Sequence, residues 1–194
     1  MANWCSYSAR IISDDSDELK SLYDLMKRLE EMETPLVENG FGNAWFGCLV
    51  TALGGDWEKI SCRGDWECLE FDGKVLSFEA DCAWYRFPDL EEFILKKFPS
   101  LKLYYYCEEP GMGIYETNDK DGVFFKARFM LDIYDDDIYY LETEDEVLDL
   151  LNKKFLKELK TMDEVTDFIV SYNEESENAG SDRYIWMNQI EVAE

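Results

Sequence analysis

The hydrophobic and polar positions of the chain follow two spacings, one typical of strands and one typical of helices. Strands are expected at residues 4–12, 57–82, 101–107, around 114–115 and at 124–133. Helices are expected after the polar cluster 13–18, ending near Thr34-Pro35, and from Pro88 to a stop before Pro99. Residues 44–50 are apolar on every side, so their periodicity does not decide between helix and strand.

The order strand, helix, strands, helix, strands predicts an α+β fold. We expect a ferredoxin-like split βαβ sandwich, in which two helices cover one face of a largely antiparallel sheet. Residues 1–131 are assigned to this domain.

Residues 132–194 differ in character, and we expect them to form an acidic, mainly helical extension docked on the first domain. Two capping boxes, Thr143 to Glu146 and Thr161 to Glu164, each predict the start of a short helix. The polar stretch 173–182 is expected to be mobile. The apolar stretch 183–188 that follows fits either a docked strand or an arm that binds a partner.

The net charge of −25, with 44 acidic residues, 19 basic residues and no histidine, excludes several function classes. Unassisted binding to nucleic acid or to an anionic membrane needs basic residues. A Ser-His-Asp triad and a His-ligated zinc need histidine. The chain shows no export signal and no apolar stretch of spanning length, so we expect a cytoplasmic protein. Residues 132–194 carry −14 of the charge.

The six cysteines and the clustered acids suggest little chemistry of their own. No cysteine pair has C-x-x-C spacing, so small buried thiols are preferred over a disulfide or a metal site. Asp132, Asp135, Asp136 and Asp137 offer oxygen ligands for Mg²⁺ or Ca²⁺, but they lack the pattern of a calcium loop and fit a solvated face better. Phosphate-binding glycine motifs are also missing. We therefore expect no enzyme, with no catalytic, cofactor-binding or metal residues.

Three segments carry a resemblance to a known family: Asn3-Trp4-Cys5, then Phe78 to Trp84 followed by Phe87-Pro88, and Glu109-Pro110-Gly111. In order and spacing, residues 1–130 are similar to plasmid and phage proteins with a YubB-type ferredoxin-like domain. The family's Trp-Gly-Thr-Lys-Trp segment is missing, and Gly54-Gly55-Asp56-Trp57 stands in its place. The resemblance implies a ferredoxin-like fold and an origin in a mobile element. The acidic last third has no counterpart in it.

The charge and this resemblance together suggest a function. We expect an acidic inhibitor that occupies the nucleic-acid groove of a basic host protein, a defence protein such as a CRISPR effector or a restriction enzyme. Carboxylates would replace phosphates, and exposed aromatic residues would anchor the contact. The expected contact residues are Asp135, Asp136, Asp137, Tyr139, Tyr140, Glu142, Glu144, Asp145, Trp57 and Trp186.

Two alternatives remain open. The first is a structural or assembly module that binds its own kind, for example as a homodimer, or another protein of the same mobile element. The second is that the acidity only keeps the protein soluble. The tryptophans have an equally plain interpretation, since large aromatic residues usually fill cores.

Overall fold

A computed structural model describes residues 3–38 and 40–193 of the chain. The first two residues and the last residue of the expected domains, and Asn39, lie outside the described part. The chain divides into two compact units, Met1–Asn118 (unit 1) and Asp119–Glu194 (unit 2). The boundary expected between residues 131 and 132 falls inside a strand of unit 2, because the run 124–133 reads as a continuation of the first domain's strands.

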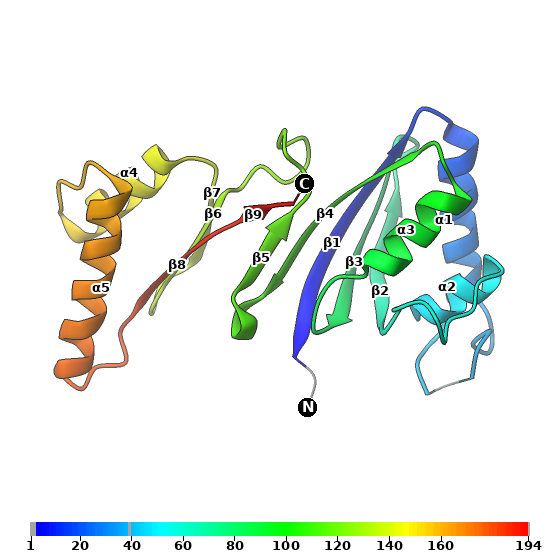
Figure 1. Cartoon of the computed structure of the whole chain (residues 1–194), viewed down its shortest axis with the longest axis horizontal. Helices are drawn as coiled ribbons and strands as arrows, with labels where there is room; N and C mark the ends of the chain where they lie inside the picture. Colours follow the sequence, from blue (N-terminus) through cyan, green and yellow to red (C-terminus); the bar gives the residue numbers. More distant parts are fainter. Residues whose placement is uncertain (1–2, 39, 194) are drawn as a thin grey trace. The chain divides into compact units, whose positions relative to one another are not determined.

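Unit 1 is an α+β unit built on an antiparallel sheet (Figure 1). Its strands lie in the order β2-β3-β1-β4-β5, and each neighbouring pair is antiparallel. Along the chain the elements are β1 (Trp4–Ser13), α1 (Ser16–Glu30), α2 (Phe46–Ala52), β2 (Gly64–Phe71), β3 (Val75–Ala83), α3 (Pro88–Lys97), β4 (Leu101–Glu109), the 3-10 turn η1 (Pro110–Met112) and β5 (Ile114–Thr117).

Strand alternation places the core of unit 1 on the side of α1 and α3 (Figure 1). In β1, Cys5, Tyr7, Ala9 and Ile11 are buried, while the residues between them are more exposed. Helix α1 contributes a buried stripe that includes Leu22. The predicted helix after residues 13–18 is confirmed, and it begins where Asp15 caps the amides of Asp17 and Glu18.

Two segments of unit 1 differ from, or go beyond, what the pattern indicated. Helix α1 ends at Glu30, before the expected stop at Thr34-Pro35. The apolar segment 44–50 lies mainly in a short helix, α2, whose residues Phe46 to Val50 are all buried. Burial on every side explains why the segment shows no periodicity.

Unit 2 combines a three-stranded antiparallel sheet with two helices, and so contains strands as well as the expected helices. The strands lie in the order β7-β6-β8, and α4 and α5 cover one face (Figure 1). A buried core joins Phe129, Leu131, Ile133, Val147, Leu151, Val165 and Ile185. The elements are β6 (Phe129–Ile133), β7 (Ile138–Leu141), α4 (Glu144–Phe155), α5 (Met162–Asn178), β8 (Ile185–Gln189) and β9 (Glu191–Val192).

Both predicted capping boxes are confirmed. Thr143 accepts the amide of Glu146 at the start of α4, and Thr161 accepts the amide of Glu164 at the start of α5. The stretch 173–182, expected to be mobile, is helical as far as Asn178, where α5 ends. The Asn173 amide explains this order, since it exchanges two hydrogen bonds of 2.9 Å with the backbone of Ile185 in β8.

The cysteines agree with the plain interpretation. All six are free thiols, and five are buried. Cys68 is exposed, where the pairing of β2 with β3 shifts register and Cys68 adopts a φ of 51°. None of the helices in the described part of the chain combines the length and the apolar composition that crossing a bilayer requires.

Candidate functional site

The face of the β7-β6-β8 sheet that points away from α4 and α5 exposes several large side chains. We call it the outer face. Alternation about the buried residues Leu131 and Ile185 defines its members. They are Met130, Asp132, Tyr134, Ile138, Tyr140, Tyr184, Trp186 and Asn188. Trp186 is 60% exposed, Ile138 55% and Tyr140 47%. Such clustering of apolar and aromatic residues is typical of surfaces that bind a partner.

Asp132 occupies the centre of the outer face. In the sheet register it stands directly between Ile138 on β7 and Trp186 on β8. The Tyr184 hydroxyl donates a hydrogen bond of 3.3 Å to Asp132 Oδ2. The Asp132 charge, together with desolvation and this hydrogen bond, raises the pKa of Tyr184. The tyrosine therefore stays a protonated donor at neutral pH.

The aromatic rings beside Asp132 meet edge to face. Tyr184 and Trp186 have ring centroids 6.0 Å apart at an interplanar angle of 87°, and Tyr134 and Tyr184 are 5.5 Å apart at 66°. A backbone hydrogen bond of 2.9 Å from Tyr134 to Tyr184 holds the two segments together. Three aromatic side chains and one carboxylate thus lie together on the β6 and β8 part of the outer face.

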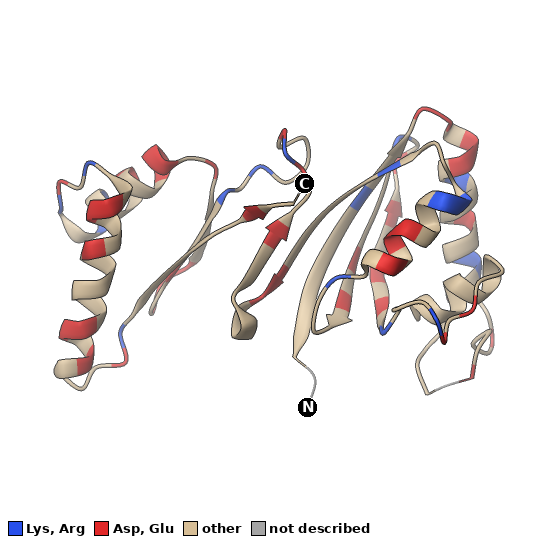
Figure 2. Cartoon of the chain, in the orientation of Figure 1, with Lys and Arg blue, Asp and Glu red and all other residues tan. Residues whose placement is uncertain are grey.

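Helices α4 and α5 carry acidic residues along their exposed sides (Figure 2). Helix α5 has six exposed carboxylates and no Lys or Arg, namely Asp163, Glu164, Asp167, Glu174, Glu175 and Glu177. None of the six forms an ion pair with a described residue. The acidic character of this third of the chain is therefore largely unneutralised at its surface.

The predicted contact residues 135–137 form the turn between β6 and β7, and all three are exposed. Asp136 is engaged on the helix side: it pairs with Lys154 and accepts the Tyr139 hydroxyl at 3.2 Å. The Lys154 hydrogen bond is the main reason that the pKa of Asp136 is lowered. Tyr139 packs against the core, whereas Tyr140 points to the outer face. The structure thus brings Tyr140 and Trp186 onto one surface and places Tyr139 behind it.

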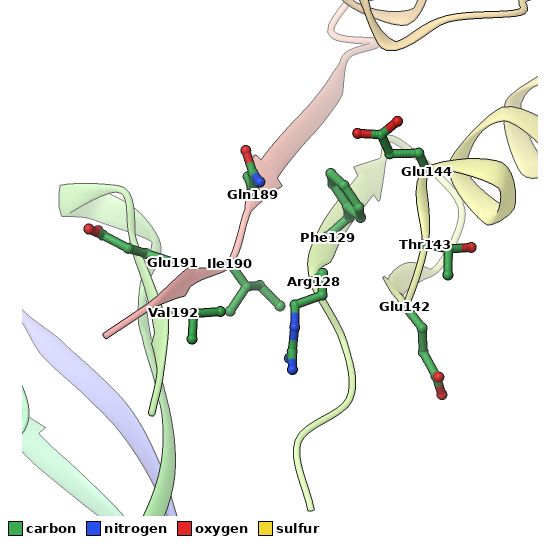
Figure 3. A pocket seen from close by; sticks show the side chains of 9 residues that line it. All are labelled: Arg128, Phe129, Glu142, Thr143, Glu144, Gln189, Ile190, Glu191 and Val192. Carbon is green, nitrogen blue, oxygen red and sulfur yellow. The ribbon is translucent and has the colours of Figure 1, made fainter. Parts of the chain in front are cut away.

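Predicted residues Glu142 and Glu144 line a groove of about 630 Å³ (Figure 3). Its one basic residue, Arg128, is already satisfied, because its guanidinium donates to the backbone carbonyls of four nearby residues. Figure 3 shows Glu191 pointing away from Arg128. Because the acidic side chains repel anions and the Arg128 guanidinium already donates to backbone carbonyls, the groove does not attract a phosphate or another anion.

The remaining two predicted residues lie elsewhere. Asp145 is exposed in the first turn of α4, where negative charge suits the helix dipole. Trp57 belongs to unit 1, packs edge-on against Trp45 at 5.2 Å and lines a pocket of about 440 Å³. Trp57 is therefore not part of the outer face.

Unit 1 contains a second polar cluster, centred on Arg86. Its guanidinium bridges Glu91 at 2.6 Å and Glu116 at 3.0 Å, all three side chains being mostly buried. Tyr7 donates to Glu91, and Tyr85 and Tyr105 donate to Glu116, so each carboxylate oxygen has a partner. Burial and the Glu116 hydrogen bond raise the pKa of Tyr85 to about 12. The cluster is fully paired and fits a role in holding α3 to the sheet.

The contact residues predicted from the sequence include Tyr140 and Trp186 but not Tyr134, Ile138 or Tyr184. Tyr184 lies within the stretch 183–188, which is interpreted from the sequence as a docked strand or a partner-binding arm, and Asp132 as a metal ligand or as part of a solvated face. The alternation of Tyr184, Ile185, Trp186 and Met187 indicates a strand with one exposed face. The four residues of β7 give no comparable pattern, because acidic residues flank them on both sides. Among the described residues, no group of three or more Cys, Asp or Glu is placed to hold a metal ion. Comparisons of the chain with protein-family models, curated proteins and solved structures find no match.

Proposed function

We propose that the protein binds a basic nucleic-acid-binding protein and blocks its nucleic-acid groove, with unit 2 making the contact. The binding is non-enzymatic. The acidic helices supply long-range attraction, and the outer face supplies aromatic anchors.

The observation that carries this proposal is the distribution of charge along α5. Glu174, Glu175 and Glu177 lie in its last turns, where the helix dipole disfavours negative charge by about 0.3–1 kcal/mol per residue. They also repel one another. Carboxylates needed only for solubility could stand at any exposed position without this cost. Their position supports selection for an external, positively charged partner.

The resemblance of residues 1–130 to plasmid and phage proteins makes a host defence effector the target that we propose. For the fold of unit 1, we propose the ferredoxin-like split βαβ arrangement. The antiparallel order β2-β3-β1-β4, with α1 between β1 and β2 and α3 between β3 and β4, supports it.

The proposal is tested by affinity purification with the tagged full chain from cells that carry it. The test variant is Glu174→Lys, Glu175→Lys, Glu177→Lys. A matched control, Glu31→Lys, Glu33→Lys, Glu38→Lys, makes the same charge change at exposed positions of unit 1. We expect the wild type and the control to retain a nucleic-acid-binding protein that added DNA or RNA displaces. Retention by the test variant at wild-type level would contradict the role of α5.

A second candidate function, an assembly module, is favoured by the apolar part of the outer face, where Ile138, Tyr140 and Trp186 are exposed. Such a surface could bind a second copy or another protein of the same element. Salt separates the two candidates. An apolar contact should survive 0.5 M salt, where the Debye length is about 4 Å, whereas binding led by α5 should weaken steeply.

A further inference from the structure

We propose that Tyr134, Tyr184 and Trp186, with Asp132, form a subsite for an arginine side chain of the basic partner. The inference rests on the proposed function, since it names the group that the outer face would receive from such a partner.

The outer face places aromatic rings beside a carboxylate. A guanidinium stacks on aromatic faces and donates two parallel hydrogen bonds to a carboxylate, so it needs both groups side by side. Asp132 stands opposite Trp186 in the sheet register and accepts the Tyr184 hydroxyl. That bond uses one acceptor position of Oδ2, and because each carboxylate oxygen can accept two hydrogen bonds, both oxygens can still take a guanidinium N–H.

The aromatic rings of the subsite are accessible from solvent. Trp186 is 60% exposed and Tyr134 is 42% exposed, so ring surface is open to an incoming side chain. The edge-to-face packing of Tyr184 against both neighbours fixes the rings. A subsite that is already ordered loses little side-chain entropy on binding.

The charged side chains around the subsite are mostly acidic. The neighbouring turn adds the exposed carboxylates of Asp135 and Asp137, which form no ion pair with a described residue. Two basic residues, Arg183 and Lys154, line a groove together with Tyr134 and Asp135. Lys154 is paired with Asp136, so the carboxylates of Asp132, Asp135 and Asp137 outnumber the remaining cation, Arg183. The subsite therefore favours a cation and disfavours an anion.

The experiment uses the full chain labelled at the tryptophan indole nitrogens and three small probes, each acetylated and amidated: arginine, citrulline and lysine. Citrulline has the shape of arginine without its charge. We expect arginine to shift the Trp186 indole signal in a saturable way, with citrulline giving no shift. Lysine should bind about threefold more weakly, because it lacks the planar fork. Asp132→Asn should weaken arginine binding about fivefold.

Controls within the same molecule sharpen the outcome. Trp4 and Trp84 are 48% and 47% exposed in unit 1, and their signals should not follow the arginine titration. Equal shifts at all exposed tryptophans, equal binding of citrulline, or unchanged affinity in Asp132→Asn would each overturn the subsite. Binding of lysine as tight as that of arginine would overturn the guanidinium assignment.

The probe does not depend on any partner protein, so the two proposals fail separately. A Trp186 shift with no nucleic-acid-binding partner in the purification would remove the proposed function and leave the subsite. A captured partner that arginine does not release, with no Trp186 shift, would remove the subsite and leave the function.

Discussion

Glu174 and Glu177 lie three residues apart near the C-terminal end of α5, both exposed and both without a described basic partner. The arrangement is unfavourable for the isolated helix, because the two charges repel each other and oppose the helix dipole. The proposed basic partner would account for such a cost at an exposed surface.

This cost leads to the first prediction. Changing Glu174 and Glu177 to lysine should raise the free energy of unfolding by about 1 kcal/mol, because positive charge suits that helix end. Chemical denaturation at low salt measures the gain. Any loss of binding in such a variant cannot be ascribed to unfolding. A variant less stable than the wild type would show that these glutamates have a structural role.

The second prediction concerns Arg86. Arg86→Met leaves Glu91 and Glu116 buried without their shared cation, and should cost about 3–5 kcal/mol of stability at pH 7. Lys20→Ala, which removes an exposed ion pair with Asp24, should cost no more than about 1 kcal/mol.

The Arg86 variant should also change the pH dependence of stability. Burial already raises the pKa of Glu91, and loss of the cation raises it further. A carboxyl with a raised pKa in the folded state binds more protons when folded than when unfolded. The deficit of the variant should therefore shrink as pH falls from about 7 to about 5. A deficit that stays constant over this range would contradict the ion-pair account.

The third prediction concerns Asp119, which is fully buried. Its two oxygens accept the amides of Val123, Phe124 and Phe125 at 2.6–2.9 Å. Burial alone would raise the pKa of Asp119, but the three amide hydrogen bonds outweigh it and lower the pKa. Asp119→Asn replaces one acceptor by a donor that faces amides, and should cost about 1–3 kcal/mol at pH 7.

For this depressed pKa, the stabilisation is present above the unfolded value near 3.9 and is lost as pH falls through the lower folded value. Stability curves of the wild type and Asp119→Asn should accordingly converge in acid. Curves that remain parallel down to about pH 2 would mean that the carboxylate charge is not what Asp119 contributes.

A fourth prediction uses the cysteines. Cys68 alone among the six is exposed, and burial raises the pKa of Cys62 to about 11 and that of Cys82 still further. A thiol reagent should modify one cysteine rapidly in the folded protein and all six after unfolding. Cys68→Ser should abolish the rapid phase. A rapid phase that persists in this variant would show that a second thiol opens readily.

The helices and strands that depend on interactions between residues close in sequence could be predicted. Thr143 and Thr161 begin helices because a hydroxyl and a carboxylate three residues later satisfy free amides. Strand β3 follows the alternation from Val75 onward. Strand β7 was not predicted, because its four residues follow three aspartates and its stability comes from tertiary contacts, namely pairing with β6 and packing of Tyr139 and Leu141 against the core.

The candidate site was predictable in part for the same reason. Tyr140 and Trp186 stand out in the sequence as large aromatic residues in an acidic region. Their meeting on one face depends on both β7 and β8 pairing with β6. Strand β7 pairs with β6 in a local hairpin, but β8 begins at Ile185, far along the chain from the end of β6 at Ile133. The role of Asp132 follows from that register alone.

We propose that unit 2 competes with nucleic acid for a basic protein. The most direct measurement is binding of labelled DNA or RNA to the captured partner, with increasing amounts of the wild type, of Glu174→Lys, Glu175→Lys, Glu177→Lys, and of the unit 1 control. We expect the wild type and the control to release the nucleic acid, and the α5 variant to do so only at much higher concentration. Simultaneous binding of the partner to nucleic acid and to the wild-type protein would contradict it.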